Sequence, residues 1–282
     1  MAQRYLKFFN AASDIWKHTN DIVSDTIDGG DPTVYVDVAS GPGEPAGTIL
    51  NRYRNIRKGY VTDGADAMLE LAKGRFSEMD STIQEKTEFV RMDLNDFSPL
   101  SGEKHNVDLM TAQFALMFTS DFSGCLKEID RVLAPGGYLI GTVWEQFDVL
   151  TLTRETMTEV LGRTPPPPPI DPLSLKERTY VDEEMRAVGF EFGARHNESR
   201  RCVFDMGSVE HDDEAFLALL IPVTPTLKDL ETNGTIPDAT NKAATILRQV
   251  AERNGNVVDG NLRLEGTYRY FVAQKPTGDS SF

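Results

Sequence analysis

Five strand-like segments alternate with helix-like segments between residues 33 and 144. We expect strands at 33–39, 58–63, 87–93, 106–115 and 138–144, and helices from about Pro45, over 66–77 and ahead of the Ala-Pro-Gly-Gly string at 134–137. The strand segments are rich in β-formers, and the helical segments carry their apolar residues on one face. Repeated strand–helix units of this length predict an α/β fold with a doubly wound, mostly parallel sheet covered by helices on both faces.

The first of these strands ends in an unusual turn. The stretch Thr-Val-Tyr-Val-Asp-Val-Ala-Ser-Gly-Pro-Gly-Glu-Pro (33–45) passes from buried β-formers through Asp37 into a glycine-rich string. Gly41 and Gly43 allow the backbone to turn tightly or to take a positive φ, which a side chain would resist. Ligands of open α/β sheets bind beyond the carboxyl ends of the strands. The sequence therefore predicts a ligand site at this turn.

The chain divides into four parts by its pattern. Residues 1–30 form a helical lead-in and 31–148 the α/β core. Residues 149–276 are a mixed region that we expect to contribute an acceptor-side lid and the carboxyl-terminal strands that complete the sheet, and 277–282 form a tail that we expect to be disordered. The mixed region is expected to hold a helix at 149–162, an extended proline spacer at 164–170, a helix at 181–190, strand material at 190–206, helices at 212–220 and 236–255, and a final strand at 262–276.

Charge and cysteine content exclude several classes of protein. The formal net charge of −15 argues against a non-specific nucleic-acid or anionic-membrane binder, since such proteins need a surface of Lys and Arg. No uncharged apolar stretch approaches the 18 residues of a membrane span. Cys125 and Cys202 are too few for a disulfide framework or a cysteine zinc site. The amino terminus resembles no signal or transit peptide, so we expect a cytoplasmic protein.

Five segments in order resemble the motifs of class I S-adenosylmethionine-dependent methyltransferases, and most closely the type 11 group that includes the ubiquinone/menaquinone C-methyltransferases. They are VYVDVASGPGEPAGTIL, GYVTDGADAMLELAKGRF, EFVRMDLNDF, VDLMTAQFALMFTSD and CLKEIDRVLAPGGYLIGTVW, which together span about residues 33 to 145. One departure is Ala39, where that family often has glycine. The resemblance implies a seven-stranded, Rossmann-like methyltransferase fold, S-adenosyl-L-methionine as cofactor and S-adenosyl-L-homocysteine as product. It also implies that residues 1–30 fold over the cofactor as a lid.

The residues at the strand ends suit this ligand chemically. Asp63 could accept both hydrogen bonds of a ribose diol, as an acid does in dinucleotide folds. Asp93 could accept from the adenine amino group, and Asp37 from the ligand's ammonium. Each of these acids could instead be a helix cap or turn former. The predicted cofactor-binding set is Asp37, Ala39, Ser40, Gly41, Gly43, Asp63, Gly64, Met68, Asp93, Leu94, Gln113 and Phe114.

A nicotinamide dinucleotide is the rival ligand. Its fingerprint Gly-x-Gly-x-x-Gly requires a third glycine where this chain has Ala46, and places a pyrophosphate near a helix start. The carboxylate of Glu44 would repel a pyrophosphate there, whereas a sulfonium ligand carries no phosphate. The sequence therefore favours the sulfonium.

The acceptor of the methyl group is less determined. We expect a small-molecule acceptor, no nucleic acid and no membrane insertion. The candidate acceptor residues are Trp16, His18, Met117, Trp144 and Glu145, with Glu145 free to steady a cationic acceptor. No metal site and no catalytic base is assigned. The alternatives are a C-methyltransferase of quinone biosynthesis and a non-catalytic regulatory protein that binds S-adenosylmethionine.

Overall fold

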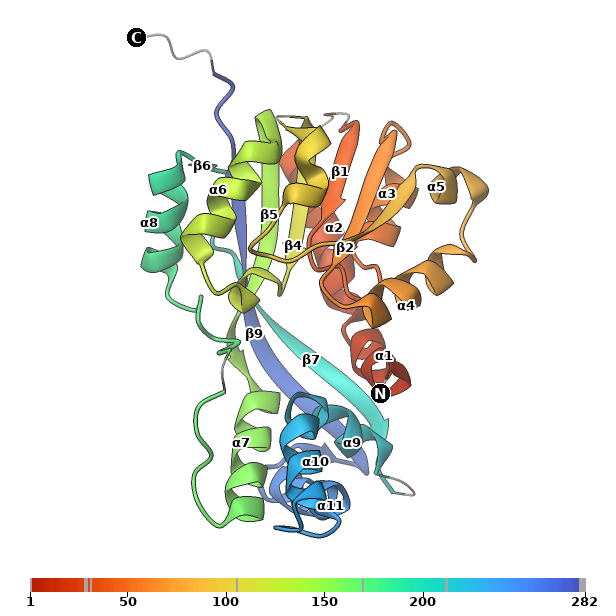
Figure 1. The fold of residues 1–282 in the computed structure, drawn as a ribbon, viewed down its shortest axis with the longest axis vertical. Helices are drawn as coiled ribbons and strands as arrows, with labels where there is room; N and C mark the ends of the chain where they lie inside the picture. The colour runs from red at the N-terminus through yellow and green to blue at the C-terminus, as the bar shows by residue number, and fades with distance from the viewer. Residues whose placement is uncertain are drawn as a thin grey trace. The chain divides into compact units, whose positions relative to one another are not determined.

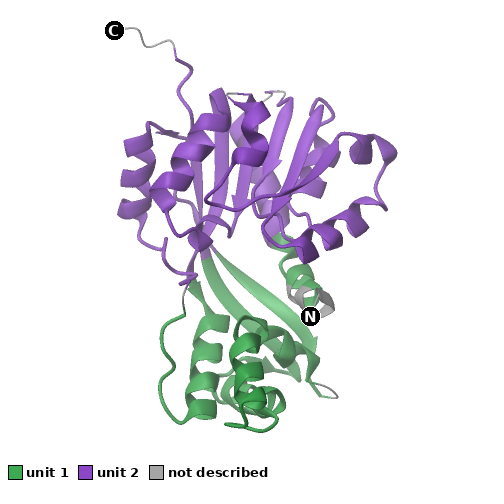
Figure 2. Cartoon of the chain, viewed as in Figure 1, with its two compact units in different colours: residues 1–14, 146–169, 201–267 green, residues 15–145, 170–200, 268–282 purple. Residues whose placement is uncertain are grey.

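The computed structural model describes residues 2–27, 30, 32–104, 106–168, 170–210 and 213–278. They form two compact units, each assembled from three stretches of chain (Figure 2). Unit 1 comprises residues 1–14, 146–169 and 201–267, and unit 2 comprises residues 15–145, 170–200 and 268–282. His105, His211 and the last four tail residues lie outside the described residues.

The sheet of unit 2 confirms the predicted fold class. Seven of the nine described strands of the sheet lie in the order β3-β2-β1-β4-β5-β9-β6 (Figure 1). They are β1 (Val34–Asp37), β2 (Lys58–Asp63), β3 (Thr87–Arg91), β4 (Val107–Gln113), β5 (Leu133–Phe147), β6 (Glu191–Phe192) and β9 (Asn261–Gln274). The pairs β1–β2, β1–β4, β2–β3 and β4–β5 are parallel, and β6 pairs with β9 antiparallel. Asp37 lies opposite Val61 on β2 and Thr111 on β4. The first five strands therefore end at one edge, as a parallel sheet requires.

Helices flank this sheet. Those of unit 2 are α3 (Ala46–Arg52), α4 (Asp66–Phe76), α5 (Ser81–Glu85), α6 (Phe122–Val132), α8 (Arg178–Val188) and most of α2 (Ser13–Ile27), with short 3-10 turns at η1 (Ser98–Glu103) and η2 (Leu116–Phe118). Asp80 caps α5 and Asp121 caps α6, each accepting a hydrogen bond from a backbone N–H of the first turn. α8 ends at Gly189 with a φ of +103°, the left-handed C-cap expected of glycine.

Unit 1 is a smaller α+β assembly. It holds α1 (Ala2–Ala11), α7 (Asp148–Leu161), α9 (Glu214–Leu219), α10 (Thr224–Thr232), α11 (Ala239–Arg253) and β8 (Val257–Val258), with η3 (Ile221–Val223) between α9 and α10. β7 (Ser199–Ser208) and β8 both pair with β9. α7 packs against α11, and α1 packs against α9. Among the described residues, no helix combines the length and apolar character needed to cross a bilayer.

Several element boundaries differ from those predicted. The amino-terminal segment forms two helices, because Ala12 is a turn and Ser13-Asp14 begins a new helix with an acid in its first turn. β5 begins at Leu133, so the Pro-Gly-Gly string lies inside the strand, where Gly136 takes a φ of +81°. α5 and α10 were not predicted, since each is short and lacks a strong apolar period.

Candidate functional site

The turn after β1 has the backbone that its glycines predicted. Gly41 and Gly43 take φ values of +54° and +94°. Ala39 also takes a positive φ of +51°, which costs an L-residue about 1–2 kcal/mol. A Cβ at Gly43 would lie 2.9 Å from the Phe76 ring on α4. Gly43 is therefore required by the packing of the turn against α4, a reason that the sequence analysis did not anticipate.

Asp37 is a fully buried acid with one oxygen left over. Its Oδ1 accepts a hydrogen bond of 2.6 Å from the Thr111 hydroxyl, which in turn lies 2.6 Å from the Tyr35 hydroxyl. Its Oδ2 is buried and accepts no hydrogen bond from any described residue. Burial raises the pKa of Asp37 to about 7, against the opposing effect of the Thr111 hydrogen bond. A buried carboxylate oxygen without a donor is costly, and a cationic ligand would satisfy it.

Asp63 joins the first two strand-end loops. Its Oδ2 accepts from the Gly41 N–H at 3.0 Å and its Oδ1 accepts from the Ala65 N–H at 2.8 Å. Burial raises the pKa of Asp63, and these backbone hydrogen bonds oppose the shift. Asp63 therefore has the turn-forming role that the sequence had left open as an alternative to ligand binding. Each oxygen keeps a further lone pair for a diol, and Gly64 beside it is exposed.

The third strand end carries Asp93 next to the second. The Met92 N–H donates to the Asp63 carbonyl at 3.0 Å, so Asp93 follows directly beside Asp63 in space. Asp93 is exposed, and its Oδ1 accepts from the backbone and side-chain nitrogens of Asn95 at 2.7 and 2.8 Å. Leu94 and Met68, the latter on α4, are half-buried.

The fourth strand end is tied to α2. The Gln113 side chain accepts from the hydroxyls of Thr19 and Thr142, at 3.0 and 3.1 Å. Phe114 follows in the left-handed region with a φ of +50°, and its N–H donates to the Thr142 carbonyl at 3.1 Å. Its ring stacks on Trp144, with centroids 4.1 Å apart and planes 12° apart. The stacking fixes one face of Phe114, which leaves only the other face for an adenine.

Trp144 and Glu145 do not share a face of the sheet. They are consecutive in β5, so their side chains point to opposite sides. Trp144 lies near the Tyr268 ring, with centroids 6.2 Å apart, whereas Glu145 accepts from Arg178 at 2.9 Å and lies 3.4 Å from the buried Arg269. The expectation that Glu145 is free to steady a cationic acceptor is therefore wrong, because two guanidinium groups already balance its charge.

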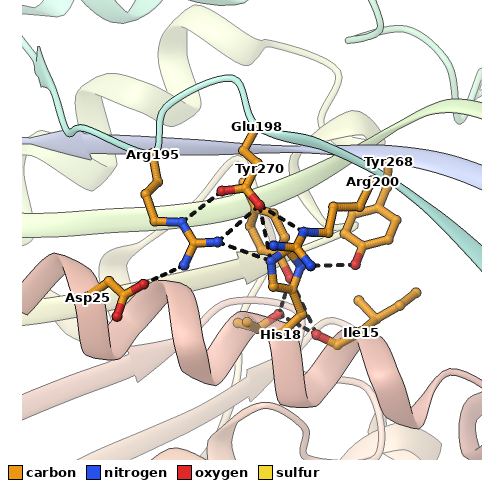
Figure 3. Close-up of polar contacts among 9 residues, drawn as sticks. Ile15, His18, Asp25, Arg195, Glu198, Arg200, Tyr268 and Tyr270 are labelled. Atoms are coloured by element: carbon orange, nitrogen blue, oxygen red, sulfur yellow. Dashed lines mark hydrogen bonds and ion pairs between the residues drawn. The ribbon is translucent and has the colours of Figure 1, made fainter.

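The other acceptor candidates are Trp16, His18 and Met117. His18 is buried on α2, and its ring contacts Tyr268 and Tyr270 of β9 (Figure 3). Trp16 is half-buried, and residues two apart on a helix do not face one another, so Trp16 and His18 serve different sides of α2. Met117 is buried in η2. No group of three His, Cys, Asp or Glu side chains within the described ranges could hold a metal ion.

Sequence reasoning missed the residues that surround His18. Tyr268 and Tyr270 lie on one face of β9, and Glu198 and Arg195 lie in the segment between β6 and β7. The alternation Tyr-Arg-Tyr at 268–270 was a usable signal, because it placed two phenols on the same face of a predicted strand. No feature of the sequence around residues 268–270 indicated that this face of the strand would contact α2.

Residues 36–141 match a family model described as a methyltransferase domain. The match spans less than half of the chain. The match covers the loops of Asp37, Asp63, Asp93 and Gln113, so the strand ends described above lie within the matched segment. The narrower ubiquinone/menaquinone group stays a prediction.

Solved structures share the fold of the chain. The YcgJ protein of Bacillus subtilis superposes with a TM-score of 0.56 at 14% identity, over 93% of this chain and 100% of that one. The [4+2]-cyclase SpnF gives 0.54 at 18% identity, over 93% and 82%. The phosphoethanolamine N-methyltransferase 2 of Haemonchus contortus, in complex with S-adenosyl-L-methionine, gives 0.55 at 15% identity, over 98% of this chain but only 57% of that protein. At these identities the likeness concerns the fold alone.

Proposed function

We propose that the chain is an S-adenosylmethionine-dependent methyltransferase that acts on a small molecule. The family of residues 36–141 supports the reaction class. The observation that carries the cofactor is Asp37, whose buried Oδ2 has no described donor at the first strand end of the domain. The ammonium group of the cofactor's methionine part is a positively charged hydrogen-bond donor, which is the kind of partner that this oxygen has no described residue to supply.

The other strand ends fit the remaining parts of this cofactor. Asp63 can accept from a ribose diol while it holds the Gly41 N–H, and exposed Asp93 can accept from an adenine amino group. The backbone of residues 39–43 brings no large side chain to the turn. When bound, the cofactor supplies an activated methyl group; the protein's part is to hold, align and dehydrate the reactants.

The same geometry disfavours a dinucleotide. The carboxylate of Glu44 accepts from the Thr48 N–H in the first turn of α3, at 3.2 Å, and from Arg75 at 2.9 Å. A pyrophosphate would need such N–H groups at this helix start. Here an acid of the chain itself already occupies one of them.

Calorimetric titration of S-adenosylmethionine into wild type and Asp63→Ala tests the proposal. Removing a carboxylate that is hydrogen-bonded to the ribose should cost about 1.5–3 kcal/mol, which weakens the Kd by about 10- to 150-fold. Asp80→Ala, which removes a charge and a helix cap of unit 2 outside the strand-end loops, should leave the Kd unchanged. Equal affinity of wild type and Asp63→Ala would refute the assignment.

A further inference from the structure

Three titratable side chains, of which His18 and Tyr268 are buried and Glu198 is half-buried, link α2, β9 and the segment before β7. The His18 Nδ1 lies 3.2 Å from the Tyr268 hydroxyl, and its Nε2 lies 3.3 Å from the Glu198 Oε1 (Figure 3). His18 is 8% exposed and Tyr268 is 3% exposed. The imidazole therefore lies between the Tyr268 phenol, which faces Nδ1, and two groups that face Nε2, the Glu198 carboxylate and the Arg195 guanidinium.

Glu198 is held ionised by two guanidinium groups. Arg195 donates to its two oxygens at 2.7 and 3.0 Å, and Arg200 donates to its Oε1 at 2.8 Å. The hydrogen bonds from Arg195, ahead of those from Arg200, lower the pKa of Glu198 to about 2. Such a carboxylate can only accept and favours a proton on His18 Nε2, whereas the Arg195 Nη2, which also lies 3.3 Å from Nε2, can only donate and favours a lone pair there. A proton relay requires the tautomer with the proton on Nε2. That tautomer leaves Nδ1 as an acceptor for the Tyr268 O–H.

The surroundings also keep His18 uncharged. Burial is the largest cause that lowers its pKa, followed by the charge of Arg200; Glu198 opposes both, and Arg195 adds to the lowering. Asp25 on α2 is already paired with Arg195 at 2.6 Å, and Tyr270 contributes only a ring edge. A neutral imidazole whose Nδ1 lone pair accepts from the Tyr268 O–H can act as a base toward that proton at neutral pH.

Tyr268 lies between His18 and two of the residues predicted for the site, Phe114 and Trp144. Its ring lies edge-on to Phe114 and to Trp144, with centroids 5.9 and 6.2 Å apart. Phe114 directly follows Gln113 at the end of β4, within the methyltransferase domain. A purely structural anchor for α2 already exists in Tyr270, whose hydroxyl lies 2.8 Å from that of Thr19 and donates to the Ile15 carbonyl at 3.3 Å. The second phenol is thus not needed for that purpose.

We propose that Tyr268, His18 and Glu198 form a proton relay, and that the acceptor is a hydroxyl compound, most simply a phenol beside the Phe114 and Trp144 rings. This inference rests on the proposed function. The acceptor oxygen forms a bond to the methyl carbon as the carbon–sulfur bond breaks, and sulfur keeps that electron pair. The acceptor's proton passes to the Tyr268 oxygen, the Tyr268 proton passes to His18 Nδ1, and the resulting imidazolium faces the Glu198 carboxylate.

The first test needs no acceptor. In ¹⁵N-histidine-labelled protein, His18 is assigned among the four histidines by its loss in His18→Gln. We expect a neutral Nε2–H tautomer at pH 7 whose Nδ1 resonance shifts in Tyr268→Phe and does not shift in Tyr270→Phe. An Nδ1–H tautomer, or an imidazolium at pH 7, overturns the relay.

The second test measures transfer of a tritiated methyl group from S-adenosylmethionine to catechol, p-cresol, benzylamine and thiophenol. We expect the phenols to be methylated, and kcat to fall about 10²-fold or more in Tyr268→Phe with KM changed less than threefold. The acid limb of the wild-type pH profile should lie below pH 6.5 and vanish in Tyr268→Phe, while Tyr270→Phe keeps it. If S-adenosylmethionine binds but only the amine or thiol, or nothing, is methylated, the relay is overturned and the cofactor assignment stands. If S-adenosylmethionine does not bind, the proposed function itself fails.

Discussion

At the scale of single residues, Asp37 couples stability to ligand binding. Its pKa is raised to about 7 by burial, whereas in the unfolded chain it titrates near 3.8. The unfolded state therefore loses its proton first as the pH rises, and the native state loses stability between the two pKa values. Asp37→Asn removes this titration. We expect the free energy of unfolding of the variant to rise relative to wild type by about 2–3 kcal/mol between pH 5 and pH 8.

Urea unfolding at pH 5, 6, 7 and 8 measures this difference. The constant cost of burying an amide shifts the variant equally at every pH, so only the slope carries the prediction. Asp66→Asn, an exposed acid of α4, should run parallel to wild type. A pH-independent difference between Asp37→Asn and wild type would mean that Asp37 is ionised throughout. The same variant should bind S-adenosylmethionine more weakly, because the amide cannot balance an ammonium.

Local sequence predicted the acids of the site but not their neighbours. Asp37 and Asp63 follow runs of β-formers, so their place at strand ends is encoded within a few residues. Thr111 and Tyr35 around Asp37 depend on the register of β1 against β4. The partners of His18 are farther still, since Tyr268 lies 250 positions away along the chain. Such pairs are fixed by packing, which a sequence pattern does not contain.

At the scale of elements, the turn after β1 packs closely against helix α4. Arg75 of α4 donates to the Pro42 carbonyl at 2.8 Å, and Gly43 lies against Phe76 and Ala72. Gly43→Ala would introduce a Cβ 2.9 Å from the Phe76 ring at a φ of +94°. We expect a loss of about 1–3 kcal/mol in the free energy of unfolding and a weaker affinity for S-adenosylmethionine.

Gly74→Ala in the same helix is the matched control. Its Cβ meets no atom within 4 Å and its φ is helical, so the substitution should stabilise the protein by about 0.5–1 kcal/mol. Thermal or urea unfolding of the two variants distinguishes them by sign. If Gly43→Ala is as stable as wild type, the turn adapts more readily than the packing indicates.

At the scale of the whole molecule, each compact unit is built from stretches of chain that are not consecutive in the sequence. Unit 2 takes its sheet from residues 34–145 but completes it with β9, which lies between β5 and β6 in the sheet order. The sequence predicted β9 as a final strand, since its alternation is local. Its place in the sheet depends on contacts such as that of the Phe271 ring with Gly141 of β5, where any side chain would clash. The sequence predicted that carboxyl-terminal strands complete the sheet, but the position of β9 between β5 and β6 is seen only in the structure.

A fragment of residues 31–148 should therefore fail to fold on its own. It lacks Tyr270, Phe271 and Val272 of β9 and Ile22 of α2, all fully buried. Burial of such side chains is worth about 1.5–3 kcal/mol each, so the loss is comparable with the whole stability of a typical domain. It also exposes β5 as an apolar sheet edge, which favours aggregation. We expect a broad, non-cooperative urea transition by circular dichroism and aggregates in size-exclusion chromatography. A chain ending at Pro276, which keeps β9, should unfold cooperatively like the full chain; a sharp transition in the 31–148 fragment would show instead that the core folds without β9.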